Sequence, residues 1–138
     1  MIGILIITHG DFADGIINSV EVILGKQENT RALGLYPGDS IDDFKEKVLH
    51  SIEQLSLKGD VLIFTDLFGA SPYNAVALNK NNAKDIEFRC ITGVNLPMLL
   101  EAFSSRTCLS INDIVEKCMK IGRDGIKELF NELQIANL

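Results

Sequence analysis

The sequence lacks the features that mark several large classes of protein. No apolar run approaches the roughly 20 residues that a membrane-spanning helix needs. No basic stretch stands out, and the formal net charge of −6 argues against nucleic acid or an anionic membrane surface as the main partner. The first residues already have the character of a strand, so we expect no signal peptide and a cytoplasmic location.

Cysteine is also scarce, and the familiar nucleotide and hydrolase motifs are missing. The three cysteines, Cys90, Cys108 and Cys118, have no Cys or His neighbour at the spacing of metal ligands, so we expect reduced thiols and no metal. The sequence contains no P-loop, no dinucleotide-binding fingerprint and no nucleophile elbow. We therefore expect no cofactor, and we place His50 on a solvated helix face.

Four apolar runs alternate with segments of helical spacing, and this alternation predicts an α/β fold with a parallel sheet. The expected strands are Ile2–Thr8, Arg31–Tyr36, Val61–Thr65 and Ile86–Thr92. The expected helices are Phe12–Leu24, a segment from Ile41 to about Leu55, Ser71 to about Asn79, Pro97 to about Ser105, and a tail from Ile111 that Gly122 and Gly125 interrupt before Ile126–Leu133. We expect one domain, a three-layer sandwich with strand order 2-1-3-4 and helices on both faces.

Two polar residues follow neighbouring strands of this predicted sheet. His9 follows the first strand and Asp66 follows the third. In open α/β sheets, ligands bind outside the carboxyl ends of the strands where the strand order reverses, and the order 2-1-3-4 places that crevice between these two strands. A carboxylate beside an imidazole fixes the tautomer and leaves the other ring nitrogen as a nucleophile or base. We therefore interpret His9 and Asp66 as the catalytic pair.

The residues after Asp66 have the composition of a phosphate-binding turn. Gly69 lets the backbone approach a ligand, and the amino end of a helix starting at Ser71-Pro72 offers free N–H groups and a positive dipole end. Ser71 is either a helix cap or a hydroxyl donor, and Thr8 is either strand filler or a second donor. The turn Thr92–Asn95 is a further candidate wall of the crevice.

Three motifs together resemble one known family. They are Thr8-His9-Gly10-Asp11-Phe12-Ala13, the stretch from Asp66 to Asn74, and Gly93-Val94-Asn95-Leu96-Pro97-Met98. In order and spacing they are similar to the IIA component of the mannose family of the bacterial phosphoenolpyruvate-dependent sugar phosphotransferase system. The family often has Gly-Gly-Ser-Pro where this chain has Gly69-Ala70-Ser71-Pro72. The added methyl of Ala70 crowds the loop slightly and removes no functional group.

The resemblance implies a function for residues 1–138 as a single EIIA domain of the mannose type. It implies a phosphotransferase component that accepts a phosphoryl group on His9 from the phosphocarrier HPr and passes it to a IIB component for sugar uptake. Asp66 would face Nδ1 of His9, and Gly69, Ala70, Ser71 and Thr8 would surround the phosphoryl group. The resemblance further implies a homodimer. In one arrangement that the resemblance allows, the C-terminal segment of each subunit adds an antiparallel strand to the sheet of the other. That segment has the spacing of a helix here.

Two other functions fit the same residues. One is the related phosphocarrier subunit that serves dihydroxyacetone kinase, with the same histidine chemistry and a different downstream partner. The other is a ligand-binding or regulatory module that has lost transfer, which the presence of both His9 and Asp66 disfavours. An apolar rim of Phe12, Phe68 and Met98 is expected either to dock protein partners or to line the core.

Overall fold

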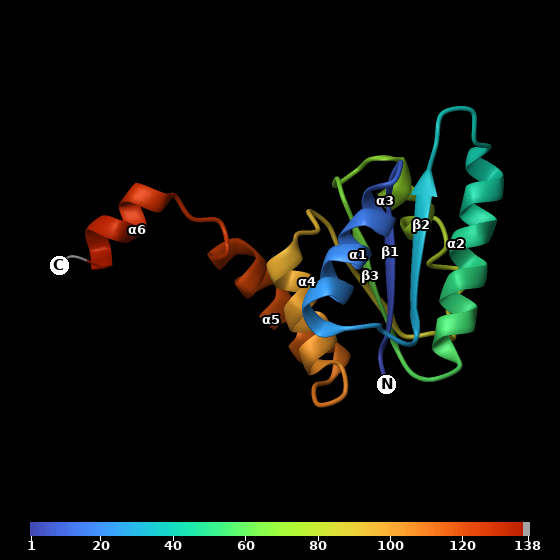
Figure 1. Cartoon of the computed structure of the whole chain (residues 1–138). Helices are drawn as coiled ribbons and strands as arrows, with labels where there is room; N and C mark the ends of the chain where they lie inside the picture. The colour runs from blue at the N-terminus through green and yellow to red at the C-terminus, as the bar shows by residue number, and fades with distance from the viewer. Residues whose placement is uncertain (137–138) are drawn as a thin grey trace.

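The structure is a computed structural model that describes residues 1–136, and its centre is a four-stranded parallel sheet in the order β2-β1-β3-β4 (Figure 1). The strands are β1 (Gly3–His9), β2 (Thr30–Leu35), β3 (Val61–Thr65) and β4 (Phe88–Ile91). The helices are α1 (Phe12–Leu24), α2 (Ile41–Ser56), α3 (Ser71–Ala77), α4 (Leu96–Ser105), α5 (Ile111–Asp124) and α6 (Leu129–Ala136). The predicted fold class and strand order are confirmed.

Helices cover both faces of the sheet because the central strands are apolar on both sides. On one face, Ile4, Ile6, Leu62 and Phe64 pack with residues of α1, α4 and α5. On the other face, Leu5, Ile7, Val61 and Ile63 pack with residues of α2 and α3. Strands buried on both faces lose the alternating pattern of a half-exposed sheet, which explains the continuous apolar runs in the sequence.

Several helix starts follow from short polar side chains. The hydroxyl of Ser40 accepts a hydrogen bond from the backbone N–H of Asp43 at 3.2 Å, and Ser110 accepts one from Asp113 at 3.2 Å. Asn95 caps α4 in the same way, accepting from the N–H of Met98 at 3.1 Å. Each of these contacts satisfies one of the backbone donors that the first turn of a helix leaves unpaired.

The C-terminal third differs from our expectation at Gly122 and contains the helix that we expected after Gly125. Helix α5 continues through Gly122, because the missing side chain lets α5 approach α4: a Cβ at this position would lie 2.6 Å from Cε of Met98. Within residues 1–136 all strand pairs are parallel, and the segment considered for an exchanged antiparallel strand contains helix α6, which projects away from the sheet (Figure 1). No helix of the described part is long and apolar enough to span a bilayer.

Arg106 ties the amino-terminal edge of the sheet together. Its side chain is 5% exposed, lies over the ring of Phe103, and donates hydrogen bonds to the carbonyl oxygens of Ile2, Glu28 and Asn29. A buried guanidinium is tolerated only when its donors are satisfied, and here the backbone satisfies them. This clamp joins the start of β1 to the loop before β2 at the end of the sheet opposite the strands' carboxyl ends.

We expect Arg106→Gln to lower the free energy of unfolding by about 3 kcal/mol, because it leaves buried carbonyl oxygens without a donor. The matched control is Arg31→Gln on the exposed surface of β2, which should change it by no more than about 0.5 kcal/mol. Urea unfolding followed by circular dichroism measures both. Equal midpoints for the two variants would show that Arg106 is not a structural clamp.

Candidate functional site

The site is built on the carboxyl ends of β1 and β3, which lie side by side in the sheet. His9 is the last residue of β1, and Asp66 directly follows β3. The His9 side chain is 49% exposed, whereas that of Asp66 is 10% exposed. The imidazole is therefore open to a partner, and the carboxylate lies beneath it.

The two side chains are in direct contact. Nδ1 of His9 lies 2.7 Å from Oδ2 of Asp66, and the backbone N–H of His9 donates to the same oxygen at 2.9 Å. The other carboxylate oxygen accepts from the N–H of Leu67 at 2.9 Å. Because an ionised carboxylate only accepts, the proton of a neutral His9 lies on Nδ1 and the lone pair lies on Nε2.

These contacts also set the charge of Asp66. Burial on its own raises the pKa of this carboxyl, but hydrogen bonds from the backbone and imidazole of His9 and from the N–H of Leu67 outweigh burial. The pKa of Asp66 therefore lies below its ordinary value. Asp66 is ionised at neutral pH and favours positive charge on the imidazole.

The turn after Asp66 leads into α3. Gly69 has a φ of +78°, and its carbonyl accepts a hydrogen bond from the side chain of Asn74 at 3.1 Å. Helix α3 is seven residues long and begins at Ser71, so that Ala70 holds the cap position that we had considered for Ser71. Ser71 is half-buried in the first turn. The turn places Gly69, Ala70 and Ser71 directly after the carboxylate that contacts His9.

The turn after β4 supports Asp66 from the other side. The N–H of Gly93 donates to the carbonyl of Asp66 at 3.2 Å, and the N–H of Val94 donates to that of Thr65 at 3.1 Å. Asn95 joins the same turn to α5 by donating to the carbonyl of Gly122 at 2.9 Å. The predicted wall 92–95 thus contacts the backbone of Asp66.

Thr8 has a different environment from the one that a phosphate contact requires. Its side chain is fully buried, and its hydroxyl accepts a hydrogen bond from the N–H of Ala13 at 2.8 Å and donates to the carbonyl of His9 at 3.1 Å. The Thr8 hydroxyl therefore caps the first turn of α1 in place of the carboxylate of Asp11. The hydroxyl of Thr8 is thus bound within the protein, where it contacts the backbone of His9, and a phosphate contact by Thr8 stays a prediction.

The side chain of Asp11 is bound by a residue that our sequence reasoning missed. Asp11 holds the cap position of α1 without a capping hydrogen bond, and its Oδ1 accepts from the hydroxyl of Tyr36 at 2.5 Å. Tyr36 follows β2, the other neighbour of β1. Because β2 also runs parallel to β1, its carboxyl end lies beside that of β1, just as the end of β3 does. Strand order alone could therefore have placed Tyr36 near the turn after His9.

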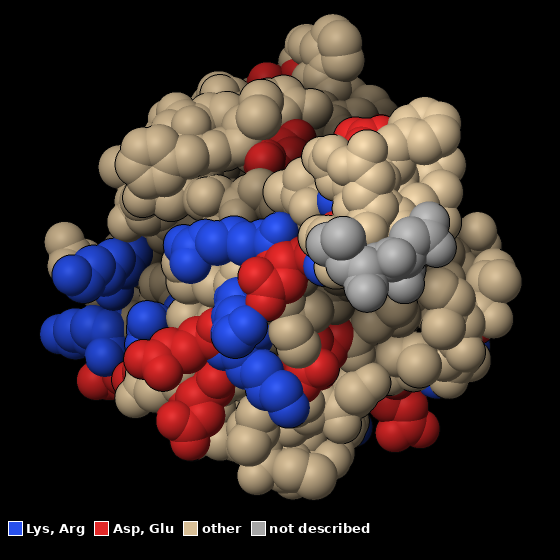
Figure 2. All heavy atoms as spheres, turned by 90° about the vertical axis from the view of Figure 1, so that its left-hand side faces the viewer, with Lys and Arg blue, Asp and Glu red and all other residues tan. Residues whose placement is uncertain are grey.

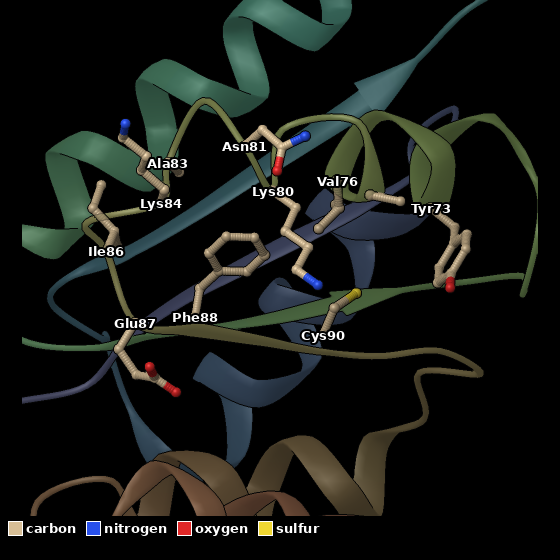
Figure 3. Close-up of a pocket in the computed structure, with 11 residues that line it drawn as sticks. Tyr73, Val76, Lys80, Asn81, Ala83, Lys84, Ile86, Glu87, Phe88 and Cys90 are labelled. Carbon is tan, nitrogen blue, oxygen red and sulfur yellow. The ribbon is translucent and has the colours of Figure 1, made fainter.

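Two of the three predicted rim residues lie at the surface. Phe12 and Phe68 are exposed, and the exposed Leu67 joins them, whereas Met98 is buried in the core. An apolar hollow of about 490 Å³ lies elsewhere, between α3 and β4, and Lys80 extends over its floor of Val76, Phe88 and Cys90 (Figure 3). This hollow does not include His9 or Asp66.

The three cysteines are unpaired, and two of them are poor nucleophiles. Burial raises the pKa of Cys90 and that of Cys118 to about 12, so both are neutral thiols at pH 7. In the described residues, no group of three or more His, Cys, Asp and Glu side chains is arranged to hold a metal ion.

We expect neutral His9 to be the Nδ1–H tautomer, because Nδ1 faces the carboxylate of Asp66. Long-range ¹H–¹⁵N correlation spectra of the histidine rings measure this directly. His50, exposed on α2, is the internal control and should show the Nε2–H tautomer that free imidazoles favour in water. Asp66→Ala should return His9 to the pattern of His50; a His9 that already matches His50 in the unaltered protein contradicts the contact.

Comparisons with known proteins match most of the chain. The family model described as PTS system fructose IIA component matches residues 3–119. The chain is 31% identical over 134 residues to the PTS system fructose-specific EIIA component of Bacillus subtilis (strain 168), covering 97% of this chain and 90% of that protein. It is 33% identical to the PTS system mannose-specific EIIAB component of Escherichia coli (strain K12), covering 93% of this chain and 39% of that longer protein.

A solved structure extends the likeness to the fold. The crystal structure of phosphotransferase system component EIIA from Streptococcus agalactiae superimposes with a TM-score of 0.87 at 32% identity, covering 95% of this chain and 99% of that one. The match of the family model covers most of this chain, and the two curated relatives exceed 30% identity over nearly all of it. The chain therefore belongs to the mannose family of EIIA components of the sugar-transporting phosphotransferase system.

Proposed function

We propose that residues 1–138 act as a single EIIA domain that carries a phosphoryl group on Nε2 of His9. The group would come from the phosphocarrier HPr and pass to a IIB component for sugar uptake. The observation that carries this proposal is the contact between Nδ1 of His9 and Oδ2 of Asp66 at 2.7 Å, with half of the His9 side chain exposed. Such an arrangement leaves Nε2 as the free nucleophile.

The transfer step follows from this geometry. The lone pair of Nε2 attacks phosphorus while the bond from phosphorus to the donor breaks, and the electron pair of that bond leaves with the donor. The imidazole gains positive charge as the new bond forms, and the ionised Asp66 stabilises this charge while Nδ1 keeps its proton. Phosphoryl transfer depends mainly on positioning and electrostatic stabilisation, and His9 and Asp66 would contribute to both.

The surroundings of His9 suit protein donors and acceptors. Gly69, Ala70 and Ser71 would contact the phosphoryl oxygens from the turn after Asp66, and Thr8 would hold the His9 backbone from beneath. Exposed Phe12, Leu67 and Phe68 form an apolar rim on which HPr and then IIB would dock in turn. The curated relatives carry different sugar names, fructose, mannose and sorbose, which favours sugar uptake over service to dihydroxyacetone kinase and leaves the sugar open. The cytoplasmic location remains a prediction.

Labelling with phosphoenolpyruvate, enzyme I and HPr tests the carrier function. We expect one acid-labile, alkali-stable phosphoryl group per chain, absent in His9→Ala and retained in His50→Ala. Asp66→Asn should slow labelling by about tenfold or more with an unchanged circular dichroism spectrum, because it removes the charge that stabilises the imidazolium. Label on the His9→Ala variant contradicts the proposal, and an unchanged rate for Asp66→Asn removes Asp66 from the mechanism.

We also propose that the protein forms a homodimer through its C-terminal arm, defined here as residues 126–136. The arm projects from the body (Figure 1) and exposes Leu129, Phe130 and Leu133. The arm also carries Lys127, Glu128 and Glu132, a net charge of −1, whereas the hollow between α3 and β4 is lined by Lys80, Lys84 and Glu87, a net charge of +1 (Figure 3). The arm of a second copy matches this hollow in apolar character and in charge.

Sedimentation equilibrium tests the dimer. We expect Phe130→Glu and Leu133→Glu to raise the dimer dissociation constant by about a hundredfold, because each removes one apolar anchor and adds a charge that must be desolvated. Gln134→Glu on the same helix is the control and should leave the constant within about threefold. A monomer for the unaltered chain at micromolar concentration, or equal effects of all three substitutions, contradicts this role of the arm.

A further inference from the structure

The segments that follow the strands carry charge of one sign, and Arg123 of α5 reaches this edge of the sheet beside Gly93 and Asn95. The four segments that follow the strands, residues 8–16, 36–44, 66–74 and 92–98, contain no Lys or Arg, and their carboxylates are Asp11, Asp14, Asp39, Asp42, Asp43 and Asp66. Elsewhere the charges are mixed, as in the pairs of Lys117 with Glu101 and Lys120 with Asp124. In Figure 2 the blue side chains lie across the middle and left of the molecule beside red ones, and the upper part shows a few red side chains among tan.

A phosphoryl group on His9 adds further negative charge to this edge. Asp66 is already bound by three N–H groups, so its charge is offset by the donors that face it. Asp11 is two residues from His9, a separation of at most about 7 Å along the backbone. Its carboxylate therefore opposes the phosphorylated state unless a donor screens it.

The structure shows such a donor. Thr8 satisfies the N–H of Ala13 and so releases the side chain of Asp11 from helix capping. The hydroxyl of Tyr36 then donates to Oδ1 of Asp11 at 2.5 Å. The pKa of Tyr36 is raised, first by this hydrogen bond and then by burial and the nearby carboxylates of Asp11, Asp14 and Asp39, so the hydroxyl keeps its proton at neutral pH.

Tyr36 is itself held in place. A Cβ on Gly34 would lie 3.0 Å from Cε2 of Tyr36 and 2.2 Å from the carbonyl oxygen of Gly10, so the ring and the turn after His9 share the space that this glycine leaves open. The N–H of Tyr36 donates to the carboxylate of Asp39 at 2.8 Å. The N–H of Gly10 donates to the carbonyl of Leu35 at 2.8 Å. The phenol and the histidine turn are therefore fixed relative to each other.

We propose that Tyr36 is a positioning residue for phosphoryl transfer, whose hydroxyl binds and screens the Asp11 carboxylate and so favours the phosphorylated state of His9. The inference rests on the proposed carrier function. A hydrogen bond from a neutral donor to an ionised acceptor reduces the negative potential that the acceptor presents to its surroundings. Tyr36 performs this task at an edge whose four segments supply no Lys or Arg.

Four proteins test this assignment: the unaltered chain, Tyr36→Phe, Asp11→Asn and the double variant. Each is equilibrated with HPr and phosphorylated HPr, and the phosphorylated fraction of each partner gives the equilibrium constant for transfer to His9. We expect Tyr36→Phe to lower this constant about threefold at low salt, because the ring remains against Gly34 while Asp11 loses its donor. We expect Asp11→Asn to raise it, and the double variant to match Asp11→Asn, because the hydroxyl then has no charge to screen.

Salt separates screening from a structural role. The deficit of Tyr36→Phe should shrink toward zero at about 1 M salt, where exposed charges are screened over about 3 Å. Asp60→Asn, which removes a carboxylate directly before β3 at the opposite edge of the sheet, is the control and should leave the constant unchanged at both salt concentrations. Urea unfolding of each variant establishes that the compared proteins are folded. If Tyr36→Phe is unfolded, the test is the increase in the equilibrium constant expected for Asp11→Asn alone.

The outcomes are distinct. If the unaltered chain takes no phosphoryl group on His9, the proposed function fails. If it does, three results overturn only the role of Tyr36. They are an equilibrium constant for Tyr36→Phe equal to that of the unaltered chain, a decrease that salt does not change, and the same decrease when Asp11→Asn is also present. An equilibrium constant for Asp11→Asn that does not exceed that of the unaltered chain overturns it as well.

Discussion

The contact between His9 and Asp66 depends on two strands ending side by side, and much of the structure serves to maintain that arrangement. Oδ2 of Asp66 receives both the backbone N–H and the ring Nδ1 of His9. The turns after β3 and β4 hold Asp66 through the N–H groups of Leu67 and Gly93. The imidazole is thus oriented from beneath by groups that are themselves hydrogen-bonded, and its outer nitrogen is left for a partner.

The chemistry of the site therefore depends on which polar atoms already form hydrogen bonds within the protein. Asp66 is ionised and fixes one nitrogen, Thr8 caps α1 and supports the His9 carbonyl, and Tyr36 binds Asp11. Each of these contacts occupies a polar group that would otherwise compete for the imidazole or, in the proposed carrier function, for the phosphoryl group. A carrier needs such an arrangement, because it must accept and release the same group and cannot bind it too tightly in either direction.

The fold could be predicted in detail because its signals are local. Continuous apolar runs such as Ile4–Ile7 identify strands buried on both faces, and Ser40 and Ser110 mark helix starts by their spacing to Asp43 and Asp113. The pairing of His9 with Asp66 followed from strand order, since parallel strands end at one edge of the sheet. These inferences need only periodicity, capping chemistry and topology.

Other features depend on packing that a single sequence does not display. Glycine usually interrupts helices, yet Gly122 lies within α5. The side chain of Met98 fills the space that a side chain at position 122 would need. The sequence leaves Thr8 either as a strand residue or as a hydroxyl donor, because only the structure places its hydroxyl 2.8 Å from the N–H of Ala13. The bond between Tyr36 and Asp11 required knowing that Gly34 leaves room for the ring.

The position of the phosphoryl group on the imidazole tests the central claim most directly. Long-range ¹H–¹⁵N NMR of the phosphorylated protein distinguishes a phosphoryl group on Nε2 from one on Nδ1. The structure, in which Asp66 occupies Nδ1, predicts Nε2-phosphohistidine at residue 9. A phosphoryl group on Nδ1 of His9 would contradict the pairing of His9 with Asp66 on which the mechanism depends.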